Sequence, residues 1–375
     1  MSLKVLVIGA YGNFGSIICR HLVAMPEVEL TIAGRDPRKL AAKLTALNAT
    51  SINPCQSWCG DAMDNGFADV LSSLQVHWVI HTAGPFQGQS YAVARRCIQA
   101  GVNYCDLSDC RTFVNGIAVL DQAARQAGVT VFSGCSSVPA LSSALIDKYR
   151  HRFQRIDSII HGISSSAKMP GLSTVQGVLA YAGKPIKQLR DGQVHEVIGW
   201  QGLELRRMPD LGLRLLANVD VPDMDIFAQR YGARTLVFKA GLGLMVGGVA
   251  NYLFAWANRV GLLADPQRWA QRLHRLGGYF ERFGDGKSAM YIDVHGVDPQ
   301  GHPLSLMLQL TAFNDKGPDI PSAAAVALVA LVVQGKSPAP GAGTCVGFVD
   351  SDHYLEAIGE PNDLHLHVRF SDEQG

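Results

Sequence analysis

The sequence carries little charge, and its charges almost cancel. Only 17% of the 375 residues are charged, and 33 Lys and Arg against 32 Asp and Glu give a formal net charge of +1. A chain without a basic excess has no overall field that attracts nucleic acid, so we expect no nucleic-acid partner. With 47% hydrophobic residues, 39 Gly and 17 Pro, the composition also excludes intrinsic disorder, a collagen-like repeat and a coiled coil.

Paired cysteines are absent as well. Among the 8 Cys, the nearest neighbours are Cys55 and Cys59, four positions apart, and Cys105 and Cys110, five apart, with no zinc-like partners beside them. This pattern favours free thiols in a reducing compartment over a disulfide scaffold or a metal site. We also expect no basic, cleavable leader, because Met1 is followed almost directly by an apolar strand pattern. We therefore expect a cytoplasmic protein.

One run without any charge is long enough to be considered as a membrane span. No residue from Ala240 to Asn258 is charged, which makes nineteen positions between Lys239 and Arg259. That length just reaches a transmembrane helix, but four glycines and Asn251 dilute its hydrophobicity. We predict a helix of the second domain that is covered by its own sheet, by a second subunit, or by peripheral contact with a membrane surface through 240–258. Of these, a homodimer through the second domain is the preferred prediction.

Short apolar runs alternate with amphipathic stretches over the first 134 residues. The apolar runs predict strands at about 3–8, 28–33, 56–60, 76–81, 103–107 and 129–133. The amphipathic stretches predict helices near 13–24, 37–47, 63–73, 88–100 and 111–126. Six strands joined through helices require parallel pairing with right-handed crossovers, so the predicted class is α/β, with a Rossmann-type doubly wound parallel sheet.

The alternation stops after Gly134. Apolar runs at 290–297 and 304–311 flank a turn and predict an antiparallel hairpin, which indicates a second, α+β domain for substrate binding and dimerisation. We place this domain at 135–320 and the Rossmann domain at 1–134, and expect the C-terminal segment, about 321–375, to pack back on the Rossmann domain.

Two histidines alternate with apolar residues near the C-terminus. Leu364 to Phe370 predicts a closing strand, in which His365 and His367 lie on one face. Their spacing fits a metal pair, but no third ligand lies nearby in the sequence. We therefore assign both to a solvated strand face and predict no metal site.

A glycine-rich turn, Gly9-Ala-Tyr-Gly12-Asn-Phe-Gly15, follows the first predicted strand and opens the first predicted helix. In a dinucleotide-binding unit, the first glycine permits the tight turn, the second lets the backbone approach a pyrophosphate, and the third lets the helix pack on the strand. The free N–H groups of the helix N-terminus then bind the phosphates. A structural turn that binds nothing is the alternative, but the strand–helix alternation behind it favours a dinucleotide site.

The end of the second predicted strand indicates which dinucleotide binds. NAD sites place Asp or Glu about 20 residues after the glycines, to bind the ribose 2′-hydroxyl. Here Arg35 stands twenty residues after Gly15, where a guanidinium can pair with a 2′-phosphate, and Arg38 or Lys39 offers a second cation. Asp36 is better explained as the cap of the second helix, with Pro37 at its first position. NADP is therefore the predicted cofactor.

Two further strand ends complete the predicted cofactor site. The fourth strand ends in a small-residue turn that can lie against the ribose or nicotinamide, and Asp61, after the third strand, can reach the adenine amine or cap a helix. The predicted cofactor-binding residues are Gly9, Tyr11, Gly12, Asn13, Phe14, Gly15, Arg35, Lys39, Asp61, Thr82, Ala83, Gly84 and Pro85.

Four segments together resemble the saccharopine dehydrogenase-like family of NADP-binding oxidoreductases. They are Val7–Gly15, Ala33–Arg35, Ala83–Phe86 and Gly101–Ser108, and their spacing matches the family pattern over about the first 140 residues. The resemblance implies NADP and the oxidation or reduction of a C–N bond in amino-acid conjugates or, in a lipid-directed branch, enoyl reduction in trans. The loop Gly134–Pro139 and the uncharged segment look closer to the second branch.

Hydride transfer also needs a group that donates the accompanying proton. The candidates at the ends of the fifth and sixth strands are Tyr104, Asp106 and Cys135, although Asp106 can equally fix a loop and Tyr104 can belong to the core. Where relatives often carry Gly-Glu, this chain has Asp109-Cys110. Two functions therefore stay open: an NADP-dependent oxidoreductase acting on a small molecule, or a non-catalytic NADP-binding sensor or accessory protein docked to a membrane or partner enzyme.

Overall fold

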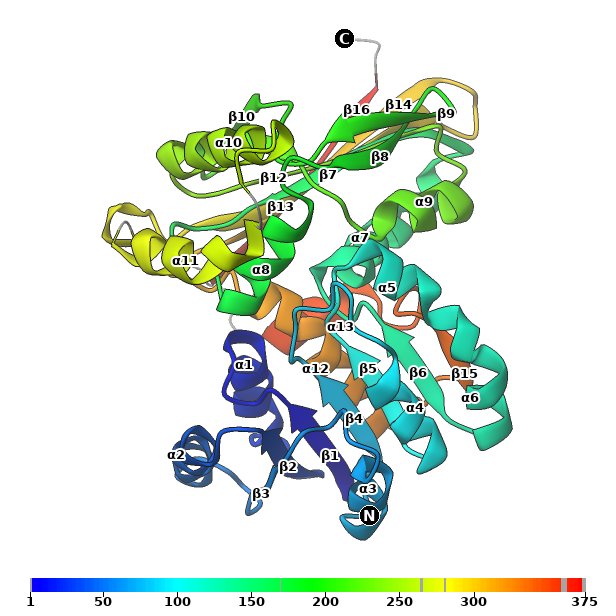
Figure 1. Ribbon diagram of the computed structural model, residues 1–375. Coiled ribbons are helices and arrows are strands. Elements are labelled where there is room, and N and C mark those ends of the chain that lie inside the picture. Colours follow the sequence, from blue (N-terminus) through cyan, green and yellow to red (C-terminus); the bar gives the residue numbers. More distant parts are fainter. Residues whose placement is uncertain (1, 169, 264–265, 280, 359–362, 373–375) are drawn as a thin grey trace. The chain divides into compact units, whose positions relative to one another are not determined.

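The chain folds into two compact units (Figure 1). The computed structural model describes residues 2–168, 170–263, 266–279, 281–358 and 363–372. The first unit consists of 1–144 and 318–359, and the second of 145–317 and 360–375.

The described part of the first unit is built on a seven-stranded parallel sheet with flanking helices (Figure 1). The strand order is β15-β6-β5-β4-β1-β2-β3, with bounds β1 Leu3–Ile8, β2 Val28–Gly34, β3 Gln56–Cys59, β4 Trp78–His81, β5 Asn103–Asp106, β6 Thr130–Ser133 and β15 Gly341–Thr344. The helices are α1 Asn13–Leu22, α2 Pro37–Asn48, α3 Phe67–Ser73, α4 Ala92–Gln99, α5 Arg111–Gly116, α6 Asp121–Ala127, α12 Asp319–Val333 and α13 Ser351–Ile358. The predicted α/β class and Rossmann-type sheet are confirmed.

Local sequence explains how the helices of this unit begin and pack. Asp36 caps α2 as predicted, since its Oδ1 accepts hydrogen bonds from the N–H groups of Arg38 and Lys39 at 3.0 and 3.1 Å. Helix α12 is rich in Ala and Val, and eleven of its residues are buried, because it packs against α1 and α13. The Arg20–Asp319 ion pair, at 3.1 Å, joins α1 to the start of α12.

The second unit is built on a mixed sheet. Its main order is β10-β11-β12-β7-β13-β14-β16, and β8 and β9 form a hairpin beside β12. The strands are β7 Arg155–Ser164, β8 Pro185–Arg190, β9 Gln193–Ile198, β10 Glu204–Met208, β11 Gly212–Asn218, β12 Thr235–Gly241, β13 Ser288–Val297, β14 Pro303–Ala312 and β16 Leu364–Asp372. The helices are α8 Leu172–Tyr181, α9 Asp223–Tyr231, α10 Met245–Arg259 and α11 Ala270–Gly278, and α7 Ser142–Tyr149 crosses the boundary between the units. The predicted hairpin is β13–β14.

The observed units correct the predicted domain boundaries of 1–134, 135–320 and 321–375. The first unit extends to residue 144, because residues 137–141 are buried and pack against α12. At the C-terminal end, residues 318–359 return to the first unit as predicted, but β16 does not. It pairs antiparallel with β14 along its whole length, from Leu364 opposite Ala312 to Asp372 opposite Leu304, because its alternating apolar residues complete the second sheet.

The uncharged segment 240–258 is only partly helical. Its first two residues end β12, and α10 begins at Met245. Within the part of the chain that the structure describes, no helix has both the length and the apolar character that a membrane span needs. One face of α10 nevertheless carries exposed apolar side chains, with Val246 71%, Leu253 57% and Trp256 49% exposed.

A homodimer that covers this apolar face stays a prediction, and a charged substitution tests it. The wild-type chain, purified without detergent, should have the mass of a dimer by light scattering, and Leu253→Glu should shift it to a monomer, because a buried charge disfavours an apolar interface. Val194→Glu is the matched control, since Val194 is 65% exposed on β9. A wild-type monomer, or protein recovered only from membranes with detergent, would contradict the prediction.

Candidate dinucleotide site

The glycine turn between β1 and α1 has the backbone that an anion site requires. Gly9 adopts a φ of +81°, and the N–H of Gly12 donates to the carbonyl of Gly9 at 2.8 Å, which closes the turn. Gly12 is the N-cap of α1 and has no side chain to satisfy the first N–H groups of the helix, and Gly12 and Asn13 are exposed. The turn therefore presents free donors at the positive end of a helix.

The three glycines of the turn have different surroundings. A Cβ on Gly15 would lie 2.3 Å from the carbonyl oxygen of Gly9 and 2.7 Å from the hydroxyl of Thr82, so α1 packs on the strands only with glycine there. A Cβ on Gly9 would lie 2.8 Å from the same hydroxyl. At Gly12 the one neighbour within 4 Å is the Gly9 carbonyl oxygen, at 3.1 Å. Gly9 and Gly15 are thus required by packing, whereas Gly12 borders open space.

The ends of β2 and β3 bring four predicted residues together. The hydroxyl of Tyr11 accepts hydrogen bonds from the N–H groups of Arg35 and Asp36, each at 3.2 Å. The Arg35 side chain is 79% exposed, with Nη1 3.7 Å from Oδ2 of Asp61, and Lys39 Nζ lies 6.0 Å from the centre of the Tyr11 ring. Lys39 Nζ also lies 3.9 Å from Oδ2 of Asp36. Two exposed cations, each in a long ion pair, therefore lie beside the glycine turn, where they can meet an anionic group.

Asp61 also accepts a hydrogen bond from the N–H of Met63 at 3.0 Å, but α3 does not begin until Phe67. Asp61 thus fixes the loop after β3 without capping the helix that we expected near residue 62. Phe14, half-buried, occupies the first turn of α1 beside Asn13.

The turn after β4 is tied directly to the glycine turn. Thr82 Oγ1 donates to the carbonyl oxygen of Ile8 at 2.8 Å, at the end of β1. Nε2 of Gln89 donates to the carbonyl oxygens of Ala83 and Pro85, at 3.0 and 2.8 Å, and so holds the rest of the turn, which includes Gly84. Thr82 to Pro85 therefore adjoin the glycine turn at the carboxyl edge of the sheet, where ligands of such folds bind.

Three buried polar side chains lie at the adjoining ends of β4 and β5. His81 Nδ1 is 3.1 Å from the hydroxyl of Tyr104, and His81 pairs in register with Asp106. Burial lowers the pKa of His81 to about 4, so its imidazole is neutral at physiological pH. Burial, with the negative charge of nearby Asp106, raises the pKa of Tyr104 well above its ordinary value. His81 was missed in the sequence because only the strand register places it opposite Asp106.

Asp106 anchors the loop that follows β6. Its Oδ1 accepts hydrogen bonds from the N–H of Ser108 at 2.9 Å, the hydroxyl of Ser133 at 2.9 Å and the N–H of Gly134 at 3.1 Å. Burial raises the pKa of Asp106 to about 6 in spite of these bonds. The sequence left open whether Asp106 donates a proton or fixes a loop. These hydrogen bonds support the loop-fixing role.

Cys135, the third catalytic candidate, is completely buried. Burial, followed by hydrogen bonds to Cys105 and Cys345, raises the pKa of its thiol well above the ordinary value. A thiol that stays protonated at neutral pH is a poor nucleophile and a poor proton donor, so these surroundings favour a packing role.

The Asp106 environment predicts a pH effect on stability. Since the folded-state pKa, about 6, lies above the ordinary value of 3.8, the stability linked to this group is complete below about pH 3.8 and is lost as the pH rises through 6. The unfolding free energy of the wild type should fall by up to about 3 kcal/mol over this pH range. Asp106→Asn keeps an acceptor oxygen but cannot ionise, so its unfolding free energy should not show this fall. Urea unfolding at several pH values between 4 and 7 measures the effect.

The matched control for Asp106→Asn is Asp69→Asn, because Asp69 is exposed on α3. We expect its unfolding free energy to follow the wild-type pH profile. Equal pH profiles for Asp106→Asn and the wild type would show that the buried carboxyl does not bind its proton more tightly in the folded state.

Comparison with known families identifies the glycine-turn unit. Residues 5–132, which hold the turn, Arg35 and the His81–Tyr104–Asp106 group, match the saccharopine dehydrogenase NADP-binding domain. The first part of the chain is therefore similar to the NADP-binding domain of saccharopine dehydrogenase. The resemblance seen in the sequence and the prediction of NADP as cofactor are both confirmed.

Solved structures extend the similarity in fold to the whole chain. Saccharopine dehydrogenase (L-Glu forming) from Saccharomyces cerevisiae is 13% identical and has a TM-score of 0.71, over 99% of this chain and 100% of that one. Amine dehydrogenase from Mycobacterium smegmatis is 14% identical and has a TM-score of 0.49, over 92% and 95% of the two chains. No curated protein matches the sequence. The first of these structures shows that both units share their fold with a member of the family.

Proposed function

We propose that this saccharopine dehydrogenase-like protein is an NADPH-dependent oxidoreductase that transfers hydride to or from a small molecule at a C–N bond or at an enoyl C=C bond. The observation that carries the proposal is the glycine turn tied through Thr82 to the His81–Tyr104–Asp106 group. A cofactor bound on that turn would have its phosphates at the N-terminus of α1. The buried polar residues would then lie beyond them, at the ends of β4 and β5.

The exposed Arg35 side chain supports a contact with the 2′-phosphate of NADP. It stands at the end of β2 beside Tyr11 and Lys39. Oδ2 of Asp61 can meet the adenine amine while Oδ1 keeps its hydrogen bond from the N–H of Met63. The backbone of Thr82–Pro85 then faces the ribose or nicotinamide, because this turn follows the strand next to β1.

The reaction needs hydride from NADPH and a proton for the reduced nitrogen or carbon. His81, Tyr104 and Asp106 are too deeply buried to meet bulk solvent, and we assign them to positioning the strand ends beside the nicotinamide. The proton then comes from the substrate's own ammonium group or from water admitted with it.

The C–N reaction follows from the family resemblance and is supported by the name of the yeast relative, which forms L-glutamate from saccharopine. The enoyl reaction is supported by the loop Gly134–Pro139, which resembles that of the lipid-directed branch. The accessory-protein alternative is not favoured, because the cofactor turn is intact and a complete second unit accompanies it.

We place the enzyme in the cytoplasm, since seven of its cysteines are buried free thiols.

The proposal is tested by following NADPH absorbance with three substrate panels. The panels are preformed imines, mixtures of 2-oxo acids with amines, and enoyl thioesters. We expect one panel to oxidise NADPH in the wild type and none to do so with Gly12→Val, which keeps the fold but not the cofactor site. Tight NADPH binding without oxidation by any panel would count against an oxidoreductase and for the accessory role.

A further inference from the structure

A carboxylate and two imidazoles meet on the surface of the second unit. Asp210, in the turn between β10 and β11, lies with Oδ2 2.6 Å from Nε2 of His367 and 4.0 Å from Nδ1 of His365. The three ligand atoms all lie within 4.8 Å of one another, and the side chains are 28%, 45% and 55% exposed, in the order given. Asp210 is thus the third ligand that the local sequence around the histidine pair lacks.

These residues meet because the β10–β11 hairpin folds back over one face of the sheet. Arg206 of β10 pairs with Asp293 of β13 at 2.5 Å, and its guanidinium lies 3.9 Å from the centre of the Tyr291 ring. Met208 and Leu211 pack with Tyr291 in a buried apolar cluster. The tip of the hairpin is thereby carried to β16, although β10 and β16 stand at opposite ends of the strand order.

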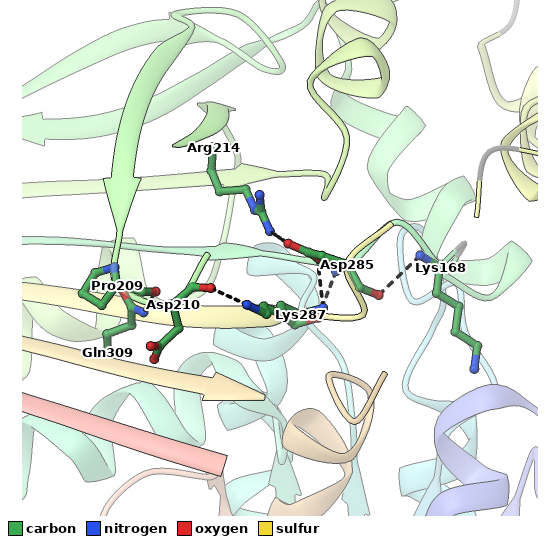
Figure 2. Close-up of polar contacts among 9 residues, drawn as sticks. Lys168, Pro209, Asp210, Arg214, Asp285, Lys287 and Gln309 are labelled. Carbon is green, nitrogen blue, oxygen red and sulfur yellow. Dashed lines mark hydrogen bonds and ion pairs between the residues drawn. The ribbon is translucent and has the colours of Figure 1, made fainter. Parts of the chain in front are cut away.

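The backbone around Asp210 is held in place on both sides (Figure 2). Its carbonyl oxygen accepts a hydrogen bond from Lys287 Nζ at 2.8 Å, and the carbonyl oxygen of Pro209 accepts one from Nε2 of Gln309 at 2.7 Å. Gln309 is buried and stands opposite His367 in the β14–β16 register. Asp210 itself has a φ of +60°, so the turn is fixed in a conformation that few side chains adopt.

The histidines are fixed by the strand that carries them. They occupy alternate positions of β16, so both rings lie on one face of the sheet, opposite Thr311 and Gln309 of β14. The ring of His365 also packs edge-on against Phe313, with 4.8 Å between ring centres. Two of the three ligands are therefore positioned by the sheet and the third by the hairpin.

We propose that Asp210, His365 and His367 bind one Zn²⁺ ion. Imidazole nitrogen and carboxylate oxygen are the donors that this ion takes at about 2.0–2.2 Å, a distance that small side-chain rotations allow from the present separations. Water fills the remaining coordination position, because the site is open to solvent. The ion joins the hairpin tip to the C-terminal strand and so stabilises the second unit.

An ordinary hydrogen-bonded His–Asp pair is the competing interpretation, and the chain contains one for comparison. On the first unit, His353 Nδ1 lies 2.7 Å from Oδ1 of Asp350, with the side chains 25% and 64% exposed. Among the residues that the structure describes, this pair belongs to no group of three possible metal ligands. If a single surface His–Asp pair sufficed for the binding, His353→Ala would weaken it as much as His367→Ala.

The test is calorimetric titration of the full chain with Zn²⁺ alone. It uses a Cys59→Ser background, because Cys59 is the exposed thiol among the described cysteines. We expect saturable binding of one ion per chain, at least tenfold weaker in His365→Ala and in His367→Ala, and unchanged in His353→Ala. Asp210→Asn should weaken it too without disturbing the turn, since Asn tolerates a positive φ.

The melting temperature tests separately whether the bound ion stabilises the second unit by joining the hairpin tip to β16. Zn²⁺ should raise the melting temperature of the background protein and leave that of the His365→Ala/His367→Ala double variant unchanged, because a ligand stabilises only the state that binds it. No saturable binding, or equal binding by the double variant, would overturn the site. Binding without a rise in melting temperature would contradict the stabilising role of the ion. None of these outcomes depends on NADPH oxidation.

Discussion

Gly12→Val should abolish NADPH binding while the protein remains folded. A Cβ at this position meets only the Gly9 carbonyl oxygen, at 3.1 Å, and φ is −73°, so the backbone accepts a side chain with little adjustment. The branched methyl groups would then project into the space that a pyrophosphate needs on the N–H groups of α1. Calorimetric titration with NADPH measures the loss, and a circular-dichroism melt measures the fold.

Gly15→Val is the contrasting control in the same turn. Its Cβ would lie 2.3 Å from the Gly9 carbonyl oxygen and 2.7 Å from Thr82 Oγ1, both held by the strands. We therefore expect a large fall in melting temperature, which Gly12→Val should not show. If Gly12→Val binds NADPH as the wild type does, with an unchanged melt, the turn is structural only.

Arg35→Ala should weaken NADPH binding about ten- to 150-fold, as expected for the loss of a charge-assisted contact. The guanidinium is 79% exposed, and the carboxylate of its ionic partner, Asp61, is 3.7 Å away, so it can turn to a 2′-phosphate without breaking a close pair. NADH has no 2′-phosphate, so its affinity should change little. Titration of the variant with both dinucleotides measures the two effects.

Two further variants show whether the effect belongs to this position. Arg38→Ala removes an exposed cation in the first turn of α2 and should weaken NADPH binding far less. Arg35→Lys keeps the charge but loses the planar fork, and should fall between the wild type and Arg35→Ala. Unchanged NADPH affinity in Arg35→Ala would remove Arg35 from the site.

The first unit was predictable because its signals are local. Strands β1 to β6 follow from apolar runs, and the start of α2 follows from Asp36 and Pro37, which act through atoms a few residues away. The glycine turn is equally local, since its geometry depends on Gly9 and on the helix that follows. These features predict the fold class and the candidate cofactor site without knowledge of distant contacts.

Features that depend on distant parts of the chain were not predictable. Strand β15, Gly341–Thr344, has no apolar run, and it is a strand because β6 offers it an edge. The pairing of β16 with β14 depends on how the second sheet is completed, and Asp210 reaches His367 across 157 residues. The opposition of His81 to Asp106 likewise requires the register of β4 with β5.

The central claim is that the turn of the first unit binds NADP through its 2′-phosphate, and parallel titration of the wild-type chain with NADPH and NADH tests it most directly. Since Arg35 and Lys39 stand where an NAD site has a carboxylate, we expect NADPH to bind at least about tenfold more tightly. Equal affinities, or tighter binding of NADH, would contradict the account.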